Sequence, residues 1–133
     1  MGTTDPQPFT LVSRGESELV DLLDVVDDRF QIKKIFEGEG IRMIRLAFRA
    51  GQVMREHSTN SPLVVQMLAG TLDFRIAGET LKLEPGSVLY VTPHEMHELE
   101  ADTDAHVLLT LGLPGRPQPV QLSDTPPVSS KGE

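Results

Sequence analysis

The feature that most constrains the fold is a succession of short segments, rich in aliphatic and β-branched residues, that begins near residue 30. In several of them apolar and polar positions alternate, as where Leu72, Phe74 and Ile76 enclose Asp73 and Arg75. Glycine-containing turns separate them, a rhythm typical of an antiparallel sandwich or small barrel, and the spacing leaves no room for βαβ crossovers. The segments are 30–36, 41–48, 63–68, 71–76, 80–83, 87–92 and 105–111.

The N-terminal part of the chain has a different pattern. Residues 1–8 contain two prolines among polar residues and are predicted to be a flexible lead-in. Ser13 followed by Glu16 suggests a capping box. The leucines and valines from 19 to 26 then predict one short amphipathic helix.

The chain is long enough for one domain, which we place at residues 9–115. Residues 116–133 form a proline-rich tail, which cannot supply a central strand because proline donates no ladder hydrogen bond. We expect this tail to be partly disordered.

Composition limits the chemistry and the partners. The chain has no cysteine, which excludes disulfides, thiolate metal sites and cysteine nucleophiles. The net charge of −8 argues against nucleic acid, whose phosphates need clustered lysine and arginine. No apolar run is long enough for a membrane helix. We therefore expect a cytoplasmic protein with a small-molecule ligand.

Four histidines are present: His57, His94, His97 and His106. His57 follows the glycine turn at Gly51, and His94 and His97 follow the segment 87–92. His106 stands in the last apolar segment. We expect His94 and His106 to be surface or rim residues.

The stretch from residue 51 to residue 70 resembles the first motif of the cupins. That motif has a glycine, five residues, His-x-His and a glutamate, with a glycine after the next strand. Gly51 and His57 have this spacing, and Gly70 stands at the closing glycine.

The stretch "PGSVLYVTPHEMHELEA" is similar to the second cupin motif, which has a glycine, a strand, a proline turn and a histidine. Gly86, Pro93 and His97 are the matching residues. Both motifs occur in order, and the resemblance spans residues 40–112. It implies an all-β fold, the double-stranded β-helix or jelly-roll barrel, preceded here by the short N-terminal helix.

The resemblance also implies a reduced metal site. Cupin metals are bound by the two histidines and the glutamate of the first motif and by the histidine of the second. His57 and His97 match two of these positions, but Thr59 and Leu63 replace the other two ligands. The expected cofactor is a divalent ion of zinc, iron, nickel, manganese or copper held by two imidazoles.

Additional polar groups at the site would come from Gln66, Thr59, His94 or Tyr90. Strand parity argues against Gln66, which should face outward when Leu63 faces inward. Arg45 and Arg75 lie on alternating segments, and we expect both on a solvent-facing side.

Two functions follow from this pattern. The first is a small metal-binding cupin that acts on or binds a small organic molecule in the barrel. The alternative is a non-catalytic cupin that binds or senses a small ligand without a stable metal. A third function, which the pattern favours less, is a barrel retained only as an oligomerisation unit. Because segment 63–68 is apolar on both faces, we also expect a homodimer. The sequence does not distinguish an enzyme from a binding protein, nor does it identify the ligand.

Overall fold

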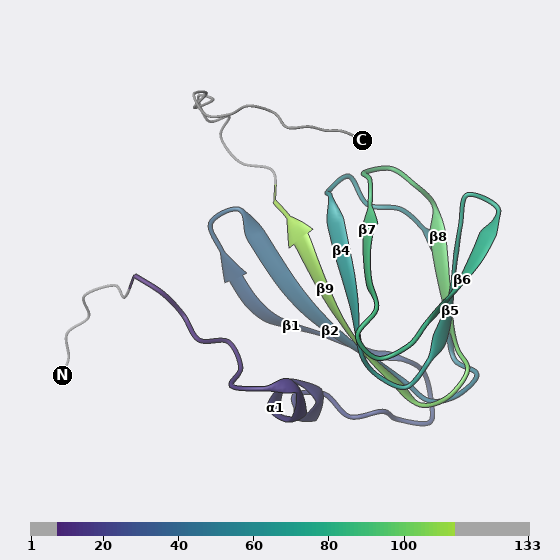
Figure 1. Ribbon diagram of the computed structural model, residues 1–133, viewed down its shortest axis with the longest axis horizontal. Helices are drawn as coiled ribbons and strands as arrows, with labels where there is room; N and C mark the ends of the chain where they lie inside the picture. Colours follow the sequence, from purple (N-terminus) through teal and green to yellow (C-terminus); the bar gives the residue numbers. More distant parts are fainter. Residues whose placement is uncertain (1–7, 114–133) are drawn as a thin grey trace.

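The computed structural model describes residues 8–113, which form one short helix and nine strands in two facing antiparallel sheets (Figure 1). The predicted all-β class with a short N-terminal helix is confirmed. The predictions for residues 1–7 and 114–133 lie outside the described residues. The elements are α1 (Glu16–Asp21), β1 (Gln31–Gly38), β2 (Ile41–Phe48), β3 (Val53–His57), β4 (Leu63–Ala69), β5 (Leu72–Ile76), β6 (Glu79–Leu83), β7 (Val88–Val91), β8 (His97–Ala101) and β9 (Ala105–Gly112).

The strand order shows how distant parts of the chain become neighbours. One sheet has the order β1-β2-β9-β4-β7, and the other has the order β3-β8-β5-β6. β2 pairs with β9, and β3 pairs with β8, so strands near the start of the barrel lie beside strands near its end. This non-local antiparallel pairing is the jelly-roll arrangement.

The core lies between the two sheets and follows the side-chain alternation of the strands. Leu46 and Phe48 of β2 and Val65 of β4 lie on the inner face of the five-stranded sheet, Phe74 of β5 belongs to the facing sheet, and all four are fully buried. At about 25 cal/mol per Å² of apolar surface removed from water, this shared core is the main source of the stability of the fold.

Two strands are absent from the sequence prediction, and both carry a histidine. β3 ends at His57, and β8 begins at His97. In β8 the burial alternates, with His97, Leu99 and Ala101 buried and the two glutamates between them half-buried. That alternation is visible in the sequence "HELEA", but the two glutamates obscure it.

The prediction that Arg45 lies on a solvent-facing side is wrong, because its side chain is fully buried. It lies on the outer face of β2, and α1 and the segment after it cover it there. Its guanidinium donates to the carbonyls of Leu19 (2.7 Å), Val20 (3.0 Å) and Leu23 (3.3 Å). Leu19 and Val20 lie in the last turn of α1, where their carbonyls otherwise accept only long turn bonds from the amides of Leu22 (3.4 Å) and Leu23 (3.3 Å), and Leu23 follows the helix. Arg45 therefore fastens the N-terminal segment to the sheet.

His106, predicted to be a surface or rim residue, lies on β9 in the same sheet as Arg45. It is half-buried beside Arg45, whose Nη2 lies 2.8 Å from the Nδ1 of His106. Arginine can only donate, so this Nδ1 must be an acceptor and the proton of the ring is on Nε2. Burial, followed by the charge of Arg45, lowers the pKa of His106, and burial lowers the pKa of Arg45 to about 10.

The predicted capping box is wrong. α1 begins after Gly15, and no side chain caps its first amide groups. The Oγ of Ser13 instead donates to the carbonyl of Gly15 at 2.7 Å, while Glu18, rather than Glu16, accepts from the backbone N–H of Arg14 at 2.5 Å. The helix is only six residues long and has no buried residue, and the hydrogen bonds from Arg45 hold it on the sheet.

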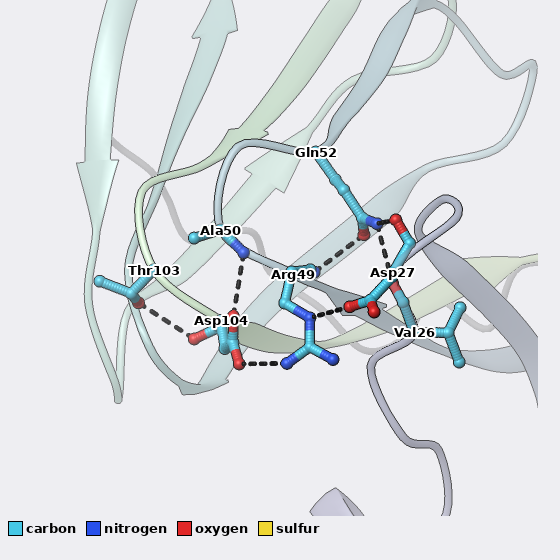
Figure 2. A network of polar contacts seen from close by, with 7 residues as sticks. All are labelled: Val26, Asp27, Arg49, Ala50, Gln52, Thr103 and Asp104. Atoms are coloured by element: carbon cyan, nitrogen blue, oxygen red, sulfur yellow. Dashed lines mark hydrogen bonds and ion pairs between the residues drawn. The ribbon is translucent and has the colours of Figure 1, made fainter.

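A polar network ties three loops together at one end of the barrel (Figure 2). Arg49 donates to Asp27 at 2.9 Å and to Asp104 at 3.2 Å. The amide of Ala50 donates to Asp104 at 2.9 Å, and Gln52 donates to the carbonyl of Val26 at 2.9 Å. The segment after α1 is thus held against the β2–β3 and β8–β9 turns.

α1, the one helix in the described range, is too short to cross a membrane.

Gly70, the closing glycine of the first motif, is required by both backbone conformation and space. Its φ is +74°, and a Cβ built there would lie 1.9 Å from the carbonyl oxygen of Asp104. Gly78 has a similar φ of +78°, but nothing lies within 4 Å of its Cβ position. Comparing the same substitution at Gly70 and at Gly78 therefore separates the cost of backbone strain from the cost of the steric clash.

We expect Gly70→Ala to lower the free energy of unfolding by more than about 3 kcal/mol, because the clash adds to the strain. Gly78→Ala, with the strain alone, should cost about 1–2 kcal/mol. Urea unfolding of both variants measures the difference. Equal losses would show that the approach to Asp104 does not matter.

Candidate functional site

A cavity of about 170 Å³ opens between the two sheets and contains both motif histidines. Thirteen described residues line it, contributed by strands of both sheets and by the loop after β3. Ten of these side chains are apolar, and His57, Thr59 and His97 are the polar ones. The cavity is therefore an apolar chamber whose polar groups belong to the β3–β8 region.

The pairing of β3 with β8 brings the two histidines together. His57 and His97 are directly opposite each other in this pair, although thirty-nine residues separate them in the sequence. Their ring centroids are 4.5 Å apart, with 61° between the ring planes. His97 is 2% exposed and stacks on Phe74 at 5.4 Å, whereas His57 is half-buried.

Each ring is held in the same way, by a hydrogen bond to the backbone two residues earlier. The Nδ1 of His57 lies 2.8 Å from the carbonyl oxygen of Arg55, and the Nδ1 of His97 lies 2.8 Å from that of Glu95. A carbonyl can only accept, so Nδ1 carries the proton in both rings. The Nε2 of each neutral ring then keeps its lone pair, which is the arrangement typical of metal-binding histidines.

The surroundings of His97 favour this neutral form. Burial, followed by the nearby His57, lowers the pKa of His97, and these effects exceed the opposing one of the hydrogen bond to Glu95. A histidine whose pKa falls below its usual value of about 6.5 is unprotonated at neutral pH. Its Nε2 is therefore available as a ligand or as a hydrogen-bond acceptor.

Thr59 and Leu63, which replace two ligands of the cupin motif, both line the cavity. Their positions agree with the register that the motif implies. Leucine offers no ligand atom, and the Oγ1 of Thr59 already accepts from the amide of Ser61 at 3.1 Å. In residues 8–113, no group of three or more His, Asp or Glu side chains is arranged to hold a metal ion.

Three of the other polar residues named as additional candidates lie outside the site. Gln66, His94 and Tyr90 do not line the cavity. Gln66 alternates with the lining residue Val65 and points to the outer face, as parity requires. His94 lies exposed in a turn with a φ of +73°, and Tyr90 is 56% exposed.

Two parts of the site are missing from the sequence prediction. The carbonyls of Arg55 and Glu95 orient the two rings, but a backbone group leaves no mark in the sequence. Phe74 was assigned only to an alternating strand, and its contact with His97 depends on the pairing of β5 with β8.

Comparison with solved structures identifies the fold. A conserved protein of unknown function from Streptococcus pyogenes has 18% identity and a TM-score of 0.68, over 86% of this chain and 95% of the other. A cupin superfamily protein from Desulfitobacterium hafniense has 16% identity and a TM-score of 0.68, over 82% and 94%. Salicylate 1,2-dioxygenase from Pseudoaminobacter salicylatoxidans, with gentisate adducts, has 20% identity and a TM-score of 0.60, over 65% and 25%.

The fold is thus that of a cupin, as the two motifs predicted. More narrowly, residues 42–116 match the AraC-like ligand-binding domain, and the chain belongs to that family. No curated protein matches the chain.

We expect nitrogen-detected NMR at about pH 7.5, above the usual histidine pKa, to show His57 and His97 with the proton on Nδ1. His106 is the internal control, because its contact with Arg45 places the proton on Nε2. An Nε2–H tautomer at His57 or His97 would contradict the assignment, because that nitrogen would then have no free lone pair.

Proposed function

We propose that the protein binds a small organic molecule in the barrel cavity, beside a divalent metal held by the Nε2 atoms of His57 and His97. The observation that carries this proposal is the matched pair of Nδ1 hydrogen bonds, each 2.8 Å long, to the carbonyls of Arg55 and Glu95. Both bonds leave a lone pair on Nε2, and the two rings lie 4.5 Å apart.

The residues present suit an ion that favours imidazole, such as zinc, nickel, copper or ferrous iron. Because Leu63 and Thr59 stand at the other ligand positions, the remaining coordination sites would be taken by water or by the bound molecule. When bound, such an ion supplies a Lewis acid that can polarise a carbonyl or activate water. The protein's own contribution is to orient both rings and to exclude bulk water with apolar walls.

A metal-free binding cupin is the alternative function, and the two replaced ligand positions favour it. Under that proposal the two Nε2 atoms accept hydrogen bonds directly from the ligand. Metal content separates the two functions.

We expect protein prepared without an affinity-tag metal to take up one zinc ion per chain after dialysis, measured by mass spectrometry of the metal. His57→Ala and His97→Ala should each weaken zinc binding by at least about tenfold, because each removes one of the two protein ligands. His94→Ala, at an exposed histidine outside the cavity, is the matched control and should bind zinc as the wild type does. Equal binding by all four proteins would contradict the metal site.

We also propose that the protein is a homodimer formed through the outer face of the five-stranded sheet. The register places Phe36, Met43, Thr110, Val64 and Tyr90 in one row across all five strands. Four members of this row are half-buried and Tyr90 is exposed, and Val88, also on β7, is 66% exposed. Within residues 8–113, α1 covers the neighbouring Arg45 and no other segment covers this mostly apolar row, which we propose meets a second copy.

We expect the wild type to elute as a dimer with light-scattering detection and Tyr90→Glu to elute as a monomer, because a buried carboxylate would oppose the contact. Met96→Glu, at an exposed apolar residue just before β8 in the other sheet, is the control and should stay dimeric. A wild-type monomer would contradict this proposal and leave the metal site untouched.

A further inference from the structure

The cavity limits the size of its ligand to about one ring. Its volume is about 170 Å³. An engineered apolar cavity of about 150 Å³ takes up benzene. A six-membered ring therefore fills this chamber, and larger groups must extend through its opening.

The walls exclude several ligand classes of that size. Among the residues that line the cavity, none is charged. A carboxylate or phosphate on the ligand would lose its hydration without a lysine or arginine to compensate it. A sugar would bury several hydroxyl groups against leucine, isoleucine and valine, and each unpaired hydroxyl costs binding free energy. The ligand is thus mostly apolar.

The polar part of the cavity specifies one functional group. The Nε2 atoms of His57 and His97 are acceptors, because the proton of each ring is on Nδ1. The Oγ1 of Thr59 accepts from the amide of Ser61, which leaves its own hydroxyl proton to donate. A ligand hydroxyl fits this set, because it donates to an Nε2 atom and accepts from Thr59.

An aromatic hydroxyl fits better than an aliphatic one. Phe74 lines the cavity and stacks on His97 with an angle of 12° between the rings, so one wall is aromatic. A phenol also ionises at about pH 10, far more readily than an alcohol, as tyrosine shows. In the metal-free site the phenol hydroxyl can donate a hydrogen bond to an Nε2 atom. In a site that holds a metal ion, the phenolate oxygen can bind the ion.

We propose that the ligand class is a single-ring phenol whose hydroxyl group faces His57, His97 and Thr59. This inference rests on the proposed function, since it uses the same cavity and the same two histidines. It adds the class of the bound molecule, which the family description does not specify.

Titration calorimetry with phenol, benzene and benzoate tests the ligand class on two preparations of the full chain, one treated with chelator and one loaded with zinc. In both, phenol should bind at least about tenfold more tightly than benzene, which fills the ring site without the hydrogen bonds. In the chelator-treated protein phenol should also bind at least about tenfold more tightly than benzoate, because no cation is present there to compensate the carboxylate. In His57→Phe the preference for phenol over benzene should fall to about threefold or less, while benzene still binds.

The outcomes separate this inference from the proposed function. Stoichiometric zinc with no preference for phenol would overturn the ligand class and leave the metal site intact. A preference for phenol in protein that takes up no zinc would support the ligand class and overturn the metal site. Tighter binding of benzoate than of phenol in the chelator-treated protein would overturn the ligand class, because it would require a cation that the walls lack. Because the main comparison uses the wild type, it does not depend on a variant that folds.

Discussion

The rest of the site depends on the antiparallel pairing of β3 with β8, which sets His57 directly opposite His97. The register shifts between Met54 and His57, so a bulge precedes the first ring. β8 also pairs with β5, which places Phe74 against His97. If β3 slipped by one residue, His57 would point out of the cavity, and one of the two Nε2 atoms would be lost from it. One strand pair therefore fixes both the fold of this edge and its chemistry.

The two faces of the larger sheet serve different purposes. Its inner face supplies apolar walls to the cavity, through residues such as Leu46 and Val65. Its outer face holds Arg45, which binds the carbonyls at the end of α1 and contacts His106. The two cavity histidines, on the facing four-stranded sheet, and His106, on this outer face, carry their ring protons on different nitrogens. A carbonyl beside Nδ1 frees the Nε2 of His57 and His97, whereas an arginine beside Nδ1 leaves the proton of His106 on Nε2.

Much of the fold and part of the site are readable in the sequence, and particular residues show where that stops. Alternation and glycine turns predict the strands, and the motif spacing places Gly70, which only glycine can occupy against Asp104. Alternation assigns a side chain to a face but not to solvent, so Arg45 was misplaced because α1 covers its face. The charged residues in "VMREH" and "HELEA" concealed β3 and β8. The carbonyls that orient the rings could not be predicted, since any residue supplies one.

The central claim is that the two imidazoles share one ion through their Nε2 atoms. It is tested most directly by diffraction from crystals grown with equimolar zinc, with data collected on both sides of the zinc absorption edge. The account predicts one anomalous peak per chain, between the Nε2 atoms of His57 and His97, with both Nδ1 atoms still bound to their carbonyls. A peak at His94 or His106 with none between the two rings would contradict it, as would the absence of any peak.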